Sequence, residues 1–428
     1  MSLRICSIAI LCRVARPLHG GKWNVNLGTD VLIFGGGCSG LWLLDELRRS
    51  GLRVLLLESG AVGGTQTTGS QGILHGGTKY VLQGMFSASA GSVRDMPARW
   101  RASLTGTIEP DLSPIRFRSR HCYLWRSDSW QSFLGMVGAQ AFLHVKPVPL
   151  PDAERPGLLT RCPGQVFRLD EEVIDTTSFA EVLAERNRGL ILQIDPARGL
   201  EFQVLPTGRV AAVRIVEPQG SRELSIDVNQ VVLAAGAGNA QLRSQVGLAE
   251  NAMQRRPLHM VLVRGDLPLF NGHCIDGAKT RVTITADRDS QGRVVWQIGG
   301  QLAEDGVRIE PAELIAHAQR ELAAVLPGWK SAGLEWTTYR IDRAEARTAD
   351  GSRPNDVQLL HENNILTIWP TKLVLAPRMA QHAIEHLGAL NHSPGLAEYR
   401  SALRELDWPA PALALPPWES QSTWISGN

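Results

Sequence analysis

The chain has 428 residues, of which 43% are hydrophobic and 20% charged, so two or three folding units can each bury a core. A formal net charge of +2 gives no bulk electrostatic reason to expect nucleic acid binding. The six cysteines are scattered without a CxxC pair, so we expect no metal site and no disulfide framework, and a reducing compartment.

Residues 1–28 precede the first clear strand, and we predict that they form a disordered extension. Their apolar run, Ile5 to Leu11, is too short to span a membrane and lacks a convincing small-residue cleavage site. No other segment reaches eighteen uninterrupted apolar residues. We therefore expect a cytoplasmic protein and leave a peripheral membrane contact open.

The next segment predicts a strand, a helix and a second strand in close succession. Val31–Phe34 is an apolar run typical of a buried parallel strand, Leu41–Arg49 has helical character, and Val54–Leu57 is apolar again. Between the first strand and the helix stand Gly35, Gly37 and Gly40, at GxGxxG spacing. This order of elements is far more specific than the three glycines alone.

Each glycine has a separate physical task. Gly35 allows a sharp turn, Gly37 leaves room for a pyrophosphate, and Gly40 lets helix and strand pack closely. The helix N-terminus then offers free N–H groups and a positive dipole end to phosphates. Glu58, followed by Ser59, ends the second strand, where a carboxylate accepts hydrogen bonds from a ribose diol. The segment therefore predicts a dinucleotide site that starts at the first strand of the fold.

Later elements follow the same logic of periodicity and turn signals. We predict a helix at 86–104 broken near Pro97, a strand at 121–126, a helix from Asp175 to Arg186 with Thr176 or Thr177 as its N-cap, a meander over 202–216 and 222–234, strands within 256–264 and 280–299, a helix from Ala312 to Val325, a strand at 365–369 and a turn into a helix over 370–387. The meander ends in the small residues VVLAAGAG, 231–238, where a backbone can approach a ligand closely.

These signals predict an α/β fold made of two interleaved parts. The first is a discontinuous Rossmann-like domain of the glutathione-reductase type, which we expect to bind a dinucleotide and to comprise 29–104, 166–254 and 341–395. The second is an antiparallel-sheet substrate domain comprising 105–165 and 255–340. Residues 396–428 are predicted to be an irregular tail.

Four segments resemble the FAD-dependent D-amino-acid oxidase superfamily, especially its glycerol-3-phosphate dehydrogenase branch. They are GGGCSG with Glu58, SQGILHGGTKYVL at 70–82, VVLAAGAG at 231–238, and WPTKLVLAPRMA at 369–380. The second and fourth are the more specific. The sequence departs from that branch where Trp369 and Pro370 replace two glycines and Lys79 replaces an arginine, which puts the natural substrate in doubt.

The resemblance implies an extended FAD with its adenosine over the first strand–helix–strand unit and the loop 63–80 beneath the flavin ring. It implies cofactor contacts from residues at the start, middle and end of the chain, namely Gly35, Gly37, Ser39, Gly40, Glu58, Ser59, Thr65, Gln66, Ser70, Gln71, Gly72, His75, Ala235, Gly236, Thr371, Lys372 and Leu373. Among these, Thr65, Gln66, Ser70 and Gln71 are expected to supply donors to phosphates or ring edges.

The same resemblance implies three catalytic residues: His75, Lys372 and Arg353. His75 faces the flavin as a base, an orienting group or a covalent anchor, and the alternative is a purely structural histidine; we favour noncovalent FAD. Lys372 lies at the helix start, where a cation stabilises the anionic reduced ring. Arg353 is expected to hold a substrate anion, with Lys79 and Tyr80 as further substrate contacts.

The implied activity is oxidation of a CH–OH group in a small anionic substrate, such as a polyol phosphate or a 2-hydroxy acid. Amine or amino-acid oxidation on the same fold is the first alternative. An FAD-binding subunit or scaffold without its own turnover is the second. The electron acceptor, whether oxygen, a quinone or another carrier, stays open.

Overall fold

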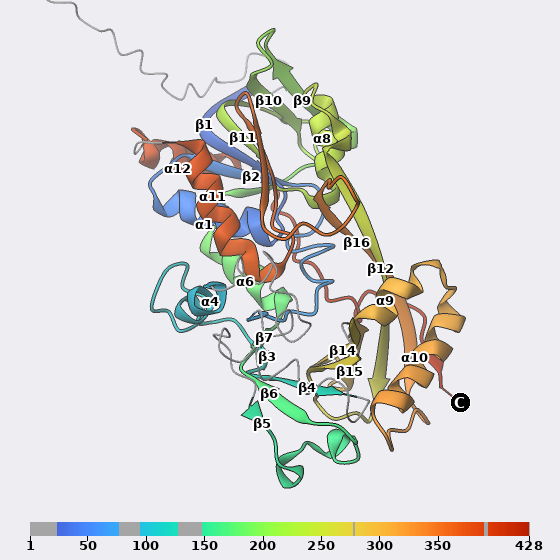
Figure 1. Cartoon of the computed structure of the whole chain (residues 1–428). Coiled ribbons are helices and arrows are strands. Elements are labelled where there is room, and N and C mark those ends of the chain that lie inside the picture. The colour runs from blue at the N-terminus through green and yellow to red at the C-terminus, as the bar shows by residue number, and fades with distance from the viewer. Residues whose placement is uncertain (1–23, 77–94, 127–147, 277–278, 389–392, 428) are drawn as a thin grey trace, which may run out of the picture.

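The computed structural model describes residues 24–76, 95–126, 148–276, 279–388 and 393–427. None of the helices described there is both long and apolar enough to cross a membrane. Two large sheets organise the chain, and Figure 1 shows one above the other, joined by the long strands β12 and β16.

The first sheet has eight strands and follows the order β17-β18-β11-β1-β2-β8, with β10 and β9 attached beside β11. The neighbours β18, β11, β1, β2 and β8 run parallel. Its strands are β1 (Asn24–Phe34), β2 (Val54–Glu58), β8 (Ile191–Gln193), β9 (Leu200–Val204), β10 (Val210–Val216), β11 (Glu223–Leu233), β17 (Gln358–Glu362) and β18 (Ile365–Trp369). The apolar runs Val31–Phe34, Val54–Leu57 and Ile365–Trp369 in these parallel strands are buried along their whole length, as near-continuous apolar sequence predicts.

Helices cover this first sheet, and α1 packs between α6 and α11 (Figure 1). The helices of this part are α1 (Cys38–Arg49), α4 (Met96–Leu104), α6 (Thr176–Arg186), α7 (Pro196–Gly199), α8 (Asn239–Gln245), α11 (Ala376–Leu387) and α12 (Leu396–Leu406). Their apolar faces and the sheet form one continuous core.

The second sheet has nine strands in the order β19-β16-β12-β15-β14-β13-β4-β6-β5. Its neighbours are antiparallel except for β13 and β4. The strands are β4 (Cys122–Arg126), β5 (Val148–Pro149), β6 (Val166–Leu169), β12 (Met253–Gly265), β13 (Gly272–Asp276), β14 (Lys279–Arg288), β15 (Val294–Gly299), β16 (Glu335–Ala346) and β19 (Ile425–Ser426). A separate pair, β3 (Phe117–Ser119) and β7 (Val173–Ile174), lies between the two sheets (Figure 1).

One face of the second sheet is apolar and is covered by helices α9 (Gln301–Asp305) and α10 (Pro311–Val325). Helix α10 buries Leu314, Ala318 and Leu322, which recur at helical spacing. The opposite face carries polar side chains, among them Thr283 and Gln297, and contacts the loop that contains Gln71. The space between the sheets is therefore the polar part of the fold.

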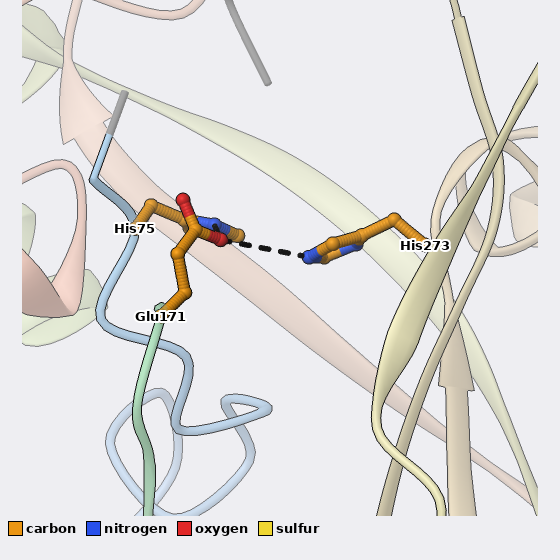
Figure 2. Close-up of side chains that lie close together, drawn as sticks. All are labelled: His75, Glu171 and His273. Atoms are coloured by element: carbon orange, nitrogen blue, oxygen red, sulfur yellow. Dashed lines mark hydrogen bonds and ion pairs between the residues drawn. The ribbon is translucent and has the colours of Figure 1, made fainter. Parts of the chain in front are cut away.

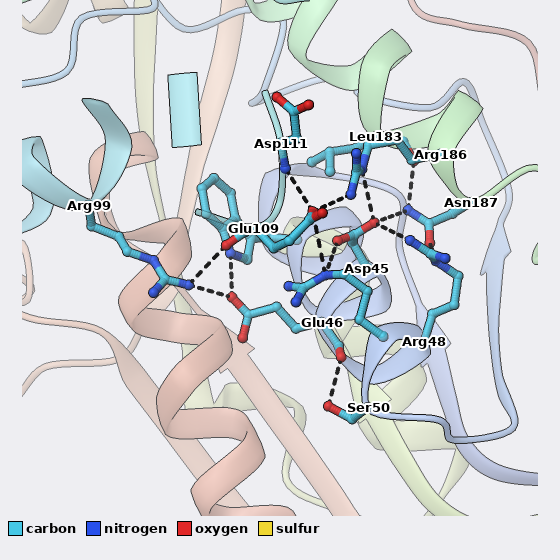
Figure 3. Close-up of polar contacts among 12 residues, drawn as sticks. Asp45, Glu46, Arg48, Ser50, Arg99, Glu109, Asp111, Leu183, Arg186 and Asn187 are labelled. Carbon is cyan, nitrogen blue, oxygen red and sulfur yellow. Dashed lines mark hydrogen bonds and ion pairs between the residues drawn. The ribbon is translucent and has the colours of Figure 1, made fainter. Parts of the chain in front are cut away.

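A buried ion-pair network ties α1 to α6 (Figure 3). The Asp45 carboxylate is fully buried and accepts hydrogen bonds from Arg48 at 3.0 Å, Arg49 at 2.7 Å and Arg186 at 3.3 Å. Arg186 also pairs with Glu109. The network anchors the first helix of the cofactor unit to the helix packed beside it.

Four details of the sequence prediction are wrong. Strand β1 begins at Asn24, inside the predicted extension 1–28. The N-cap of α6 is Asp175, whose carboxylate accepts from the N–H groups of Thr177 and Ser178. Val166–Leu169 pairs in the second sheet, although the predicted boundary assigned it to the cofactor domain. Helix α12 occupies the start of the predicted irregular tail, where Tyr399 and Leu403 join the main core.

Candidate active site

The glycine turn between β1 and α1 leaves no room for side chains at two positions. Gly35 has a φ of +106°, and a Cβ there would lie 2.6 Å from the carbonyl oxygen of Ala234. A Cβ on Gly40 would lie 1.9 Å from the carbonyl oxygen of Gly35. The turn is thus held between Ala234 and Ala235, which directly follow β11, and the first turn of α1.

Helix α1 begins at the glycine turn with backbone N–H groups and a positive dipole end, which is the kind of site that binds phosphates. Its N-cap, Gly37, supplies no side-chain hydrogen bond. The N–H of Cys38 donates to the hydroxyl of Thr67 at 3.0 Å. The hydroxyl of Ser39 is buried and has no hydrogen-bond partner among the described residues. Sequence reasoning missed Thr67, since only the folded loop brings it to the helix start.

Glu58 is held in place at the carboxyl end of β2. Its two carboxylate oxygens accept from the N–H groups of Gly36 and Gly60, each at 2.6 Å. Both donors are backbone groups, so the carboxylate is oriented by the fold itself. Ser59 follows it and is exposed. The position suits a ribose diol, as the sequence predicts.

The loop after β2 bridges the two sheets. Gln66 accepts through Oε1 from the N–H of Ala344 on β16, at 3.0 Å. Gln71 donates through Nε2 to the carbonyl oxygens of Thr283 at 3.1 Å and Gln297 at 2.9 Å. The side-chain amide that was predicted to face the cofactor therefore fastens the loop to the second sheet.

Three further predicted cofactor residues lie in this loop, and two of them have left-handed backbones. Thr65 has a φ of +50° and Gly72 a φ of +72°, where a Cβ would lie 2.2 Å from the carbonyl oxygen of Ile174. The Ser70 hydroxyl donates to the carbonyl oxygen of Thr67 at 2.8 Å. The loop is thus shaped by close backbone approach, and Ser70 stabilises it from within.

The predicted C-terminal segment supplies a second buried hydroxyl. Thr371 has a φ of +61°, and its Oγ1 is buried without a hydrogen-bond partner in the described part of the chain. Lys372 follows it, with its N–H donating to the carbonyl oxygen of Pro370 at 2.7 Å, and Leu373 opens a short 3-10 turn that leads into α11. Gly236, in the 3-10 turn Gly236–Gly238 that follows β11, has a φ of +55°, and a Cβ there would lie 3.9 Å from Oε1 of Gln66.

Of the three predicted substrate residues, Arg353 is the one that lies within the described part of the chain. Arg353 lies half-buried in the connection between β16 and β17. Lys79 and Tyr80 lie outside the described residues.

His75 belongs to a cluster that the sequence did not reveal (Figure 2). Its Nδ1 lies 3.3 Å from Oε2 of Glu171, and the same oxygen lies 4.0 Å from Nε2 of His273. The imidazole centroids are 5.5 Å apart. Glu171 and His273 are fully buried, whereas the His75 side chain is 19% exposed.

Strand pairing explains why these distant residues meet. Ile73 forms an antiparallel bridge with Val173, and the N–H of Leu74 donates to the carbonyl oxygen of Glu172. The bridge sets His75 beside Glu171. His273 lies on β13, which pairs with β4, and β4 pairs with β6, the strand that ends just before Glu171. The acidic run at 170–172 was the one sequence signal for this carboxylate.

The site as a whole fits an extended dinucleotide. The α1 N-terminus, the oriented Glu58 and the two buried hydroxyls of Ser39 and Thr371 provide donors and acceptors of the kind that a dinucleotide needs. The family model described as FAD dependent oxidoreductase (DAO) matches residues 30–376. The chain belongs to this family. It is an FAD-dependent oxidoreductase, and the predicted fold class and cofactor are confirmed.

Individual relatives agree with this assignment. The probable FAD-dependent oxidoreductase PA4991 of Pseudomonas aeruginosa strain PAO1 is 40% identical over 402 residues, which cover 92% of this chain and 98% of the relative. Its crystal structure matches with a TM-score of 0.73 at 35% identity, again over 92% and 98% of the two chains.

More distant solved structures share the fold. Glycine oxidase from Geobacillus kaustophilus matches at 17% identity with a TM-score of 0.56, over 84% of this chain and 95% of its own. L-alpha-glycerophosphate oxidase from Mycoplasma pneumoniae, solved with FAD bound, matches at 13% identity with a TM-score of 0.56, over 86% and 97%. At these identities the likeness shows the fold alone.

Proposed function

We propose that this DAO-family oxidoreductase oxidises a CH–OH group of a small anionic substrate, a polyol phosphate or a 2-hydroxy acid. Bound FAD supplies a two-electron acceptor that takes a hydride. The residues of the chain position the substrate, tune the ring and assist loss of the hydroxyl proton.

The observation that carries this proposal is the cluster of His75, Glu171 and His273 beside the loop expected to underlie the flavin. An alcohol must lose its O–H proton as the carbon gives up a hydride, so the site needs a group that assists deprotonation. A neutral amine already offers a nitrogen lone pair and has less need of one. Two imidazoles around a buried carboxylate therefore favour a hydroxy substrate over an amine.

The proposal of an anionic substrate depends on two cationic side chains. Lys372 precedes α11 and is proposed to stabilise negative charge on the reduced ring and on the substrate. Arg353 is proposed to hold the substrate anion through its planar guanidinium, with Lys79 and Tyr80 as further contacts. FAD is proposed to be bound noncovalently, so acid precipitation should release the yellow colour into the supernatant.

The decisive experiment is an anaerobic reduction screen of the purified holoenzyme. Hydroxy acids, polyol phosphates, amino acids and amines are added separately, and loss of flavin absorbance is followed. We expect bleaching by a hydroxy compound. Bleaching by amines alone would overturn the proposal in favour of CH–NH oxidation, and no bleaching by any donor would favour a subunit without its own turnover.

A variant pair connects the reaction to the cluster. His75→Gln should slow bleaching by the hydroxy substrate, whereas His386→Gln, at an exposed position on α11, should leave the rate unchanged. Equal rates for both variants would remove His75 from the mechanism. Reoxidation with oxygen and with a soluble quinone then identifies the electron acceptor.

A further inference from the structure

Three side chains with metal-ligand chemistry converge in the described part of the chain, at the edge of the proposed substrate site (Figure 2). We propose that His75, Glu171 and His273 bind a divalent metal ion, zinc by their chemistry, and that this ion receives the hydroxyl oxygen of a 2-hydroxy acid. The inference rests on the proposed function and narrows its substrate class. Sequence spacing predicted no metal site, because the three ligands come from distant segments.

The geometry is close to that of a bound ion. The three ligand atoms lie within 4.8 Å of one another, with 3.3 Å between His75 and Glu171 and 4.0 Å between His273 and Glu171. Zinc binds nitrogen and oxygen at about 2.0–2.2 Å, which needs ligand atoms roughly 3.0–3.5 Å apart in a tetrahedral site. Side-chain shifts of about 1 Å or less would close the site.

Each of the two buried ligands already has an outer hydrogen bond that fixes its orientation. Glu171 accepts through Oε1 from the N–H of Gly76 at 2.7 Å, which leaves Oε2 toward the histidines. His273 contacts the hydroxyl of Thr283 through Nδ1 at 2.9 Å, which turns Nε2 toward Glu171. Outer partners of this kind are typical of metal-binding imidazoles and carboxylates.

Charge balance also favours a cation. Glu171 and His273 are fully buried, and within the described residues the charged partners of Glu171 are the two histidines. If both imidazoles are neutral, the described residues leave the buried Glu171 carboxylate without a charged partner, and burying an unpaired charge is costly. A divalent cation neutralises it and uses the neutral form in which histidine binds metals.

Three protein ligands leave a tetrahedral ion one open position, as catalytic zinc sites do. His75 is the one of the three ligands that is partly exposed, so the cluster is reached from the side of His75. A 2-hydroxy acid can present its hydroxyl and carboxylate oxygens together and chelate the ion in a five-membered ring, which would expand the ion to five-coordinate. The ion lowers the pKa of the bound hydroxyl, and the proton leaves to solvent.

The first test is zinc titration of the FAD-loaded enzyme, after chelator treatment, by calorimetry and by metal analysis. We expect one zinc per chain in the wild type. His273→Asn and Glu171→Gln should each weaken zinc by more than about 100-fold, and Thr283→Val, which removes only an outer partner, by about 10–100-fold. His386→Gln should bind as the wild type does. Absence of tight zinc in the wild type, or unchanged binding in both ligand variants, would overturn the site.

X-ray absorption at the zinc edge tests the proposed ligands in the wild type, so this measurement does not require any variant to fold. We expect a shell of nitrogen and oxygen near 2.0–2.1 Å with imidazole scattering, whereas a sulfur shell near 2.3 Å would place the ion on cysteines and refute the site. Flavin reduction then separates the two proposals. Bleaching by hydroxy acids with no zinc bound overturns the metal site alone, and zinc bound at these residues without bleaching overturns the hydroxy substrate.

Discussion

Gly40 offers the sharpest test of how the fold binds FAD. A Cβ at this position would lie 1.9 Å from the carbonyl oxygen of Gly35, about 1 Å closer than such atoms approach in real structures. The obstacle is backbone, which cannot rotate away. Gly40→Ala must therefore push the start of α1 away from the glycine turn that is predicted to hold the phosphates.

The size of the effect follows from the displaced contacts. Overpacking of this kind costs about 1–3 kcal/mol. If the cost falls on the FAD-bound state, the FAD dissociation constant rises about 5- to 150-fold, since each 1.4 kcal/mol is tenfold. The same overpacking also destabilises the cofactor-free protein, so the unfolding midpoint of cofactor-free Gly40→Ala should be lower than that of the cofactor-free wild type.

The assay is FAD binding to chelator-treated, cofactor-free protein, followed by the change in flavin fluorescence. Gly28→Ala is the matched control, because Gly28 lies on β1 in the same unit and its added Cβ would meet only the end of the Arg53 side chain at 3.5 Å. FAD affinity of Gly40→Ala equal to that of the control would refute the reasoning, since the close approach would then have no energetic consequence.

Three further predictions concern single side chains. Ser39→Ala removes a buried hydroxyl that has no partner among the described residues, so FAD should bind about 3- to 10-fold more weakly while the cofactor-free protein loses no stability; equal losses in both states would contradict a cofactor contact. Asp45→Asn should lower the free energy of unfolding by about 2–4 kcal/mol in chemical denaturation. This loss is smaller than the loss expected on breaking a fully enclosed ion pair, because the arginines that contact Asp45 are about a quarter exposed. A loss below about 0.5 kcal/mol would show that the network of Figure 3 does not stabilise the fold. Lys372→Ala should slow flavin reduction about 10- to 100-fold with FAD retained, whereas Lys330→Ala, at an exposed position, should not, and unchanged reduction would remove Lys372 from the site.

The same Asp45 network predicts an acid limit to stability. Burial alone would raise the pKa of Asp45, but hydrogen bonds from Arg49 and Arg48 and the charge of Arg186 outweigh it, so the pKa falls below its ordinary 3.8. A lowered folded-state pKa stabilises the fold above that ordinary value, and the stabilisation is lost as pH falls through the folded-state pKa. Unfolding midpoints measured downward from pH 5 should therefore drop less steeply in Asp45→Asn than in the wild type, and parallel curves would exclude Asp45 as a contributor.

The cofactor unit could be predicted from sequence because its constraints are local. Strand, turn, helix and strand follow one another within about thirty residues, and Gly35 and Gly40 are required by contacts inside that unit or with the next parallel strand. The apolar runs of β1 and β11 likewise report burial on both faces of a parallel sheet. These short-range signals predict the dinucleotide-binding fold, whereas the family and FAD follow from the resemblance of four such segments spread along the chain.

The tertiary structure alone decided which polar groups meet between the sheets. Gln71 looked like a cofactor ligand, but the second sheet takes its amide. Glu171 belongs to none of the sequence motifs, and it lies beside His75 because Ile73 and Val173 form an antiparallel bridge. His273 lies near Glu171 because its strand β13 pairs with β4, and β4 pairs with β6, which ends just before Glu171. Strands can pair in this way however far apart they are in the sequence. Residue order encodes the local turn and helix, whereas a cluster built by strand pairing exists only once the chain has folded.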